Sequence, residues 1–257
     1  MQPAAARSAY PEDSSPLALA PPAPTLPGIS IVLPCHDEAE NVAAMVEDAR
    51  AAARRVADAF EVIVVDDGST DATLLIARAA ATRMPELRIV THEANRGYGA
   101  AVRSGFEAAR MPWVFLVDAD RQFDLDQLDG FVPSAARYDV IAGRRVQRAD
   151  ALSRRAAAGA WNVLMRRLFG IPVHDVDCAF KLIRRDLLQS LSLTAEGAML
   201  STELIVRCMR AGARIEERDV LHLPRAAGRQ SGLRPRVVAR AFRELALTRR
   251  ALAADRP

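Results

Sequence analysis

Short, mainly apolar runs alternate along this chain with longer segments in which apolar residues recur every three to four positions. The short runs are typical of strands buried on both faces, as in a parallel sheet. They lie at residues 29–33, 60–65, 87–90 and 113–117. The longer segments predict helices with one apolar face. They lie at residues 42–56, 70–83 and 98–110. Regular alternation of this kind predicts an α/β fold: a mixed, mainly parallel sheet flanked by helices on both faces.

The second half of the chain continues this pattern less regularly. We expect strands at 140–142 and 214–223, and helices at 125–137, at 153–169 and from 201–204 onward. Ser201 is a candidate cap of that last helix. Glu203 is either a first-turn acid favoured by the helix dipole or a carboxylate of a functional site.

Three segments are expected from composition. Residues 1–27 are rich in Pro, Ala and Ser and predict a disordered leader. Residues 28–232 form the main domain. Residues 233–257 predict a basic amphipathic helix, which either docks on the domain or lies on an anionic membrane.

Nothing in the sequence predicts a membrane span or a secretory signal, because no apolar run approaches about 18 residues. Cys35, Cys178 and Cys208 are too few and too scattered for a disulfide framework or a zinc site. A reducing cytoplasm is therefore the expected location.

The charge distribution indicates the kind of partner. All basic residues except Lys181 are arginines, and many follow Arg144, whereas acidic residues dominate the first half. This bias favours an anionic partner for the later half, either phosphates or a membrane surface. The net charge is only +3 and no aromatic–basic platform is present, so nucleic acid is not expected.

Two aspartates, Asp118 and Asp120, directly follow the apolar run 113–117. In open α/β sheets ligands bind beyond the carboxyl ends of the strands. Paired carboxylates there suit Mg²⁺ or Mn²⁺, which also bridges nucleotide phosphates. Alone, the pair is more typical of a solvated turn. However, three of the four early strands end in acidic or glycine-bearing segments, which predicts a site along one edge of the sheet.

Other polar residues near strand ends have two interpretations each. Asp67 either accepts hydrogen bonds from a ribose or base, or caps a helix. Residues 95–101 are not a dinucleotide motif, because Val102 stands at the third glycine position. They predict a tight turn into a helix, with Arg96 near phosphate. Lys181 is either a point charge at a site or an edge-strand residue.

Six short motifs occur in a specific order. They are Ile31-Val32-Leu33-Pro34 with Glu38 and Asn41, Val64-Val65-Asp66-Asp67-Gly68-Ser69-Thr70-Asp71, Asn95-Arg96-Gly97 with Gly99 and Ala100, Asp118-Ala119-Asp120 with Gln122, Asp177-Cys178-Ala179-Phe180-Lys181, and Pro224-Arg225 with Gly228 and Ser231. Together they resemble the family 2 glycosyltransferases of the GT-A (Rossmann-like) fold, in particular the dolichol- and polyprenyl-phosphate mannosyl- and glucosyltransferases. The resemblance covers about residues 29–231.

The resemblance implies roles for individual residues. The nucleotide-sugar site would comprise Pro34, His36, Glu38, Val65, Asp67, Arg96, Asp118, Ala119, Asp120, Gln122, Arg225 and Arg229. The metal, Mg²⁺ or Mn²⁺, would be held by Asp118, Asp120 and Gln122. Catalysis would involve Asp118, Asp120, Arg144, Asp177 and Lys181. Two positions depart from the family pattern: His36 replaces a Tyr or Phe, and Gly232 stands where many relatives have Lys.

The activity implied is transfer of a sugar, with inversion, from a nucleotide-diphosphate sugar of the GDP-mannose or UDP-glucose type to a polyprenyl phosphate. The protein would then work at the cytoplasmic face of a membrane, bound peripherally or through a membrane-protein partner. One alternative is a transferase with a saccharide or small-molecule acceptor, which would need Asp177 or Glu203 as a base. Another is a regulator that binds a nucleotide sugar without turnover.

Overall fold

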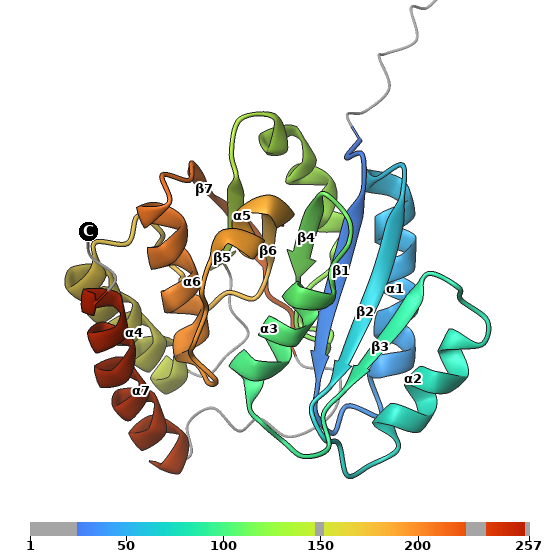
Figure 1. Cartoon of the computed structure of the whole chain (residues 1–257), viewed down its shortest axis with the longest axis horizontal. Coiled ribbons are helices and arrows are strands. Elements are labelled where there is room, and N and C mark those ends of the chain that lie inside the picture. Colours follow the sequence, from blue (N-terminus) through green and yellow to red (C-terminus); the bar gives the residue numbers. More distant parts are fainter. Residues whose placement is uncertain (1–24, 147–151, 225–234, 255–257) are drawn as a thin grey trace, which may run out of the picture.

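The computed structural model describes residues 25–146, 152–224 and 235–254, and these form one mixed sheet covered by helices (Figure 1). The sheet has seven strands in the order β3-β2-β1-β4-β6-β5-β7. The strands are β1 (Ile29–Cys35), β2 (Phe60–Asp66), β3 (Leu87–Thr91), β4 (Trp113–Leu116), β5 (Val140–Val146), β6 (Lys181–Arg184) and β7 (Ile215–Leu221). Strands β1 to β4 are mutually parallel, β6 is antiparallel to β4 and β5, and β7 is parallel to β5. The predicted mixed, mainly parallel α/β sheet is confirmed.

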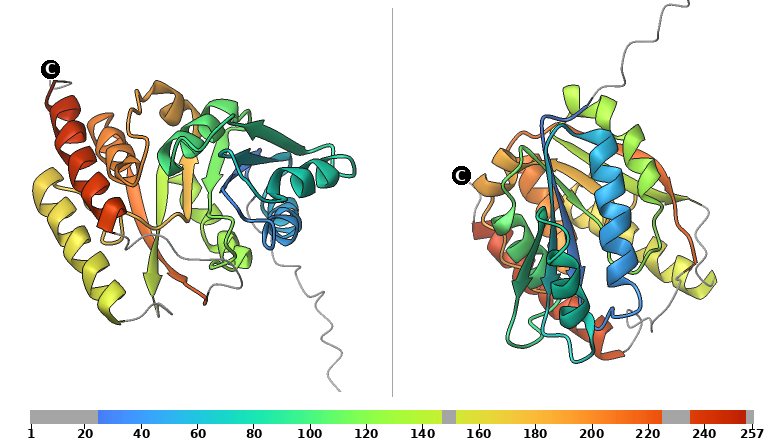
Figure 2. Two further views of the ribbon diagram at one scale, coloured as in Figure 1. Left: turned by 90° about the horizontal axis from the view of Figure 1, so that it is seen from below. Right: turned by 90° about the vertical axis from the view of Figure 1, so that its right-hand side faces the viewer.

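Helices cover both faces of the sheet (Figure 2). One face carries α1 (Val42–Val56), α2 (Thr73–Ala81) and the 3₁₀ helices η1 (Leu125–Gly130) and η2 (Val132–Ala136). The other face carries α3 (Tyr98–Ala108), α5 (Arg185–Ser190) and α6 (Met199–Arg210). Helices α4 (Leu152–Phe169) and α7 (Pro235–Ala254) lie beyond α6, at the end of the molecule away from β3. Among the described residues, none of these helices is long and apolar enough to cross a lipid bilayer.

The mainly apolar runs form strands because successive side chains enter two different cores. In β1, Ile31 and Leu33 pack into the core under α1, whereas Val32 packs into the core under α3. The same alternation occurs in β2. All of these side chains are buried, and each such burial stabilises the fold by about 1.5–3 kcal/mol. The strands are therefore held rigidly, and so are the loops at their carboxyl ends.

Some predicted boundaries differ from the structure. Residues 125–137 form two 3₁₀ helices instead of one α-helix, because Gly130 breaks the segment and Pro133 lacks an amide hydrogen. Helix α5 was not predicted. Helix α6 begins at Met199, so Ser201 lies inside it and is not its cap.

The folded part of the chain begins earlier than predicted, and it ends in the predicted helix. Residues 1–24 of the predicted leader lie outside the described residues. Leu26, assigned to that leader, is buried and pairs with Ala57 next to α1, so the folded part begins before the predicted boundary. The predicted C-terminal helix is present as α7.

Candidate active site

The carboxyl ends of β1, β2 and β4 meet at one edge of the sheet. Cys35 of β1 is in register with Asp66 of β2, and the amide of Val117 donates to the carbonyl of Val32 at 3.2 Å. The segments that follow these strands therefore converge, and they carry most of the residues that the sequence singled out.

Asp118 is partly enclosed at this edge and has charged neighbours. The hydroxyl of Tyr98, the first residue of α3, donates a hydrogen bond to its carboxylate. Burial raises the pKa of Asp118, whereas the Tyr98 hydrogen bond and the charges of Arg145 and Lys181 oppose that rise. Burial and the adjacent Asp118 charge likewise raise the pKa of Tyr98. The carboxylate of Asp118 is thus oriented by a tyrosine and stabilised by two cations.

The turn after Asp118 is fixed by Asp120 and Gln122. A carboxylate oxygen of Asp120 accepts a hydrogen bond from the amide of Gln122 at 3.2 Å. Between them Arg121 has φ +59°, which is uncommon for a residue with a side chain. The side-chain amide of Gln122 donates to the carbonyl of Leu223 at 3.2 Å, and the backbone carbonyl of Gln122 accepts from the Leu223 amide at 2.8 Å. Gln122 therefore ties this turn to the chain beyond β7.

The two arginines at the end of β5 have different surroundings. Arg144 donates to Asp219 of β7 at 2.6 Å, in an exposed pair. Arg145 makes two side-chain hydrogen bonds of 2.7 Å to the buried Asp175. Burial would lower the pKa of Arg145, but the hydrogen bonds to Asp175 outweigh it and keep the pKa raised. Arg145, which the sequence analysis did not name, is the arginine whose charge acts on Asp118.

Lys181 is completely buried in β6, between β4 and β5. The edge-strand interpretation is therefore wrong. Its ammonium donates to the carbonyl of Val176 at 3.0 Å and to that of Cys178. Burial lowers its pKa. Lys181 thus holds the segment that contains Asp177, whose charge acts on both Lys181 and Tyr98.

The loop after β1 is joined to the loop after β2. The Nδ1 atom of His36 lies 3.0 Å from the carbonyl oxygen of Asp67, and the carboxylate of Asp37 accepts from the amide of Thr70 at 2.7 Å. Asp37 itself has φ +55°. Glu38 accepts from the side chain of Asn41 at 2.6 Å. Pro34 is half-buried at the start of this loop.

Asp67 is buried and its carboxylate organises the turn before α3. One oxygen accepts from the Arg96 amide at 2.9 Å and lies 2.6 Å from His92 Nδ1, and the other accepts from the Gly97 amide at 2.8 Å. In this structure Asp67 therefore positions a loop, and its contact with a ribose or base stays a prediction. The Arg96 side chain is exposed, and Val65 is fully buried beneath the site.

A second loop, residues 194–197, covers the beginning of α3. The carbonyl of Glu196 accepts hydrogen bonds from the amides of Gly99 at 2.8 Å and Ala100 at 3.2 Å. The fully buried Glu203 holds this loop, because its carboxylate accepts from the amides of Thr194 at 2.9 Å and Ala195 at 2.7 Å.

The same carboxylate of Glu203 also accepts from the Thr194 hydroxyl and from Arg207, each at 2.9 Å. Neither role considered for Glu203 fits this arrangement, because it lies beyond the first turn of α6 and all its contacts are internal.

Other predicted site residues have simpler outcomes. Ala119 is buried at the edge beside the two aspartates. Arg225 and Arg229 lie outside the described residues. Within the described ranges, no group of three or more His, Cys, Asp or Glu side chains is placed to hold a metal ion on its own.

Sequence analysis missed Tyr98, Arg145 and Asp175. Strand alternation in β5 does indicate that Arg144 and Arg145 face opposite sides. Which of the two arginines lies near Asp118 depends on the order of the strands in the sheet, which local sequence does not give.

This edge, with two aspartates after a parallel strand of a mixed sheet, is that of a glycosyltransferase fold. The chain belongs to glycosyl transferase family 2, whose model matches residues 30–192. The predicted family and GT-A fold are confirmed.

Curated relatives carry specific names. The chain is 32% identical over 203 residues to an undecaprenyl-phosphate 4-deoxy-4-formamido-L-arabinose transferase from Pectobacterium carotovorum subsp. carotovorum, covering 78% of this chain and 61% of the relative. It is 34% identical over 172 residues to a dodecaprenyl-phosphate galacturonate synthase from Rhizobium johnstonii, covering 65% and 51%. The chain thus matches only about half to three-fifths of each relative's length.

Solved structures support the fold. A glucosyl-3-phosphoglycerate synthase from Mycobacterium tuberculosis, crystallised with Mn²⁺, uridine diphosphate and phosphoglyceric acid, superposes with a TM-score of 0.68. It is 20% identical and covers 88% of this chain and 78% of that chain. At this identity the similarity concerns the fold alone.

Proposed function

We propose that the protein is an inverting glycosyltransferase that moves a sugar from a nucleotide-diphosphate sugar to a polyprenyl phosphate. The observation that carries the proposal is the pair Asp118 and Asp120 at the carboxyl end of β4, with Tyr98, Arg145 and Lys181 around Asp118. Family membership and the names of the curated relatives, which act on polyprenyl phosphates, support it.

The donor set fits a divalent cation. Asp118 and Asp120 supply carboxylate oxygens and Gln122 an amide oxygen, which are the ligands that Mg²⁺ and Mn²⁺ accept. Two carboxylates are too few for an all-protein cage, so oxygens of the donor diphosphate would complete the shell. When bound, the ion would neutralise charge on the departing nucleoside diphosphate.

The chain's own residues prepare the site for that charge. The Tyr98 hydroxyl orients Asp118, and Asp175 holds the Arg145 guanidinium in place. Lys181 fixes the segment 175–178 through two backbone carbonyls. Groups held in advance stabilise a developing charge without having to reorganise. The proposed roles of His36, Glu38, Asp67 and Arg96 are to surround the nucleotide.

The reaction would be a single displacement. A phosphate oxygen of the acceptor forms a bond to the anomeric carbon while the bond to the nucleoside diphosphate breaks, and configuration inverts. A phosphate oxyanion is ionised near neutrality, so it needs no strong base. A hydroxyl acceptor would need one. Of the two candidate bases, Glu203 is enclosed and fully hydrogen-bonded, which leaves Asp177. The loss of one candidate base favours the phosphate acceptor.

The first test is a donor and acceptor screen with Mn²⁺ or Mg²⁺. Release of nucleoside diphosphate from UDP- and GDP-sugars is followed with and without short-chain polyprenyl phosphate in detergent. Lipid-dependent release supports the proposal and identifies the sugar. Donor binding without lipid-dependent release would refute the lipid acceptor, and absence of donor binding would refute the nucleotide-sugar site.

A variant pair tests the aspartates. Asp120→Ala should abolish transfer and leave the melting temperature nearly unchanged. The matched control is Asp129→Ala, because Asp129 lies on an exposed part of η1 and pairs only at 3.4 Å with Arg55. Equal turnover in the two variants would refute the assignment of Asp120. The proposed location is the cytoplasmic face of a membrane, where a polyprenyl phosphate would be accessible.

A further inference from the structure

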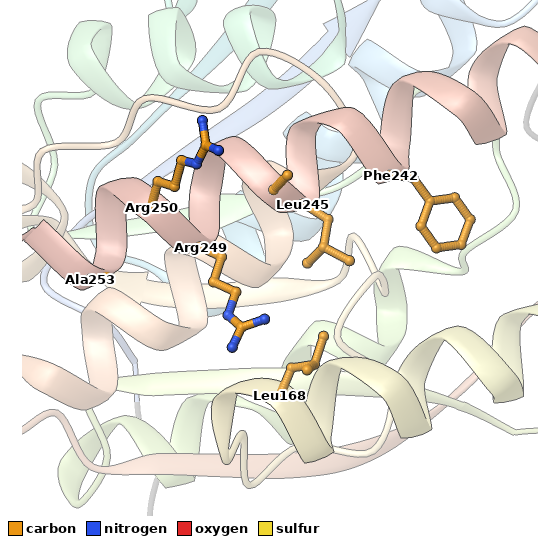
Figure 3. Close-up of a pocket in the computed structure, with 7 residues that line it drawn as sticks. Leu168, Phe242, Leu245, Arg249, Arg250 and Ala253 are labelled. Atoms are coloured by element: carbon orange, nitrogen blue, oxygen red, sulfur yellow. The ribbon is translucent and has the colours of Figure 1, made fainter.

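Helices α4 and α7 lie side by side at the end of the molecule farthest from β3, although about 65 residues separate them in sequence (Figures 1 and 2). A groove of about 500 Å³ runs between them. Leu168 of α4 faces Leu245 and Arg249 of α7 across this groove, with Phe242 at one end (Figure 3). Arg250 also lines the groove, and its side chain points away from Leu168 (Figure 3).

Two large apolar side chains that line the groove are exposed to solvent. Phe242 is 53% exposed and Leu168 is 41% exposed. The ring of Phe242 is nevertheless held in place, because it stands edge-on to Trp161 with centroids 5.7 Å apart. Exposed apolar side chains next to arginines on one helix face are typical of a helix that lies at a membrane interface.

The opposite face of α7 is docked on the domain. Thr248 and Leu252 are buried, and Arg210 of α6 donates a hydrogen bond to the carbonyl of Leu252. The sequence left open whether this helix docks on the domain or lies on a membrane. In the structure α7 docks by one face, and its other face is available for a second contact.

The charged residues of α4 and α7 are almost all positive. The α4 sequence contains four arginines and no acidic residue, and the α7 sequence contains five arginines and one glutamate. That glutamate, Glu244, lies against Gly197 of the 194–197 loop and not in the groove. Arg249 and Arg250 are exposed. A second copy of this cationic face would be repelled, whereas an anionic surface would be attracted.

We propose that the α4–α7 face docks on an anionic lipid bilayer, with both helices parallel to the membrane plane. Phe242 and Leu168 would contact the acyl boundary, and Arg249 and Arg250 would contact lipid phosphates. The inference deepens the proposed function, because it names the surface through which the enzyme would meet a membrane-embedded acceptor. It depends only on the exposed residues of these two helices.

The test is binding of the full chain to vesicles without donor or polyprenyl phosphate. Wild-type protein should float with vesicles that contain phosphatidylglycerol and not with pure phosphatidylcholine, and salt should weaken the binding. Arg249→Gln with Arg250→Gln should lower the partition coefficient roughly 30-fold, since each arginine near an anionic surface contributes roughly fivefold. Phe242→Ala should also reduce binding.

Helix α2 and the residues just after it, at the opposite end of the sheet, supply matched controls. Arg78→Gln with Arg83→Gln removes the same charge from exposed positions, and Leu75→Ala removes a side chain that is 71% exposed. These variants should bind vesicles like wild type. Equal losses in both sets would indicate non-specific charge attraction and overturn the proposal. The proposal would also be overturned if wild-type protein proved dimeric by light scattering and Phe242→Ala dissociated the dimer without changing vesicle binding.

Transfer to a short-chain acceptor in detergent separates this inference from the proposed function. The Arg249 and Arg250 variant should retain that transfer while losing vesicle binding. Inactive wild-type protein that still binds anionic vesicles would refute the proposed activity and leave the docking surface standing. Active wild-type protein that does not bind the vesicles would refute the docking surface alone.

Discussion

Replacement of Glu203 by Gln tests whether this carboxylate has a structural or a chemical role. Glu203 is fully buried and accepts four hydrogen bonds: two from backbone amides, one from the Thr194 hydroxyl and one from Arg207. In the best orientation, glutamine keeps the backbone contacts on its oxygen, and the Thr194 hydroxyl reverses to accept from the new amide. The amide group then faces the Nε–H of Arg207, and that contact is lost.

The expected loss follows from this geometry. A hydrogen bond between charged groups contributes about 1.5–3 kcal/mol. For a protein of this size each kcal/mol lowers the melting temperature by about 2–4 °C, so Glu203→Gln should melt about 3–12 °C lower. Transfer per folded molecule, measured well below the transition, should persist because Glu203 does not reach the site.

The control is Glu107→Gln, an exposed position on α3 that should melt like wild type. Both variants are compared by thermal unfolding and by transfer at 20 °C, a temperature chosen to lie below both transitions. The reasoning would be refuted by an unchanged melting temperature together with abolished transfer. That pattern would return Glu203 to the role of catalytic base.

Three further predictions concern pH, packing and metal. Hydrogen bonds from Arg88 and others outweigh burial and lower the pKa of Glu61, so Glu61→Gln should cost about 1–3 kcal/mol at pH 7. The pKa of Glu61 is lower in the folded than in the unfolded state. The difference in unfolding free energy between wild type and Glu61→Gln should therefore be complete above about pH 4.3 and disappear as the pH falls further. Urea titrations that give the same difference at every pH would contradict this. Gly99→Ala should destabilise, since a Cβ would lie 2.7 Å from the carbonyl carbon of Glu196, whereas Gly159→Ala meets nothing within 4 Å and should stabilise α4 by about 0.5–1 kcal/mol; equal melting temperatures would refute the packing argument. Chelation with EDTA should abolish donor binding measured by calorimetry, and Mn²⁺ should restore it; binding unaffected by EDTA would exclude the metal from the donor site.

The parallel half of the fold was predictable because local pattern and tertiary environment agree there. Strands β1, β2 and β4 are buried on both faces, so each reads as a mainly apolar run, and β3 at the edge of the sheet is partly buried. Asp118 and Asp120 could be located for the same reason, since the sheet ends where the apolar run ends. The 3₁₀ break at Gly130 and Pro133 was also visible in the sequence, although the apolar spacing outweighed it in the prediction.

The antiparallel insertion was not predictable from local pattern. Strand β6 has only four residues, and its place between β4 and β5 is fixed by pairing with segments far away in the chain. This placement buries Lys181 and brings the Arg145–Asp175 pair near Asp118. Glu203 was misassigned for a related reason, since its partners belong to an irregular loop that no periodicity identifies.

The start of α3 has a consequence for how the site meets negative charge. A helix N-terminus commonly cradles phosphate with its free amides. Here the amide of Gly97 is bonded to the carboxylate of Asp67, and those of Gly99 and Ala100 are bonded to the carbonyl of Glu196. These three amides already donate to acceptors within the protein, so they are not available to bind a phosphate. Under the proposed function, a diphosphate at this edge would be neutralised by side chains and a bound cation instead. Its affinity should then respond to metal concentration more than to any change in the α3 backbone.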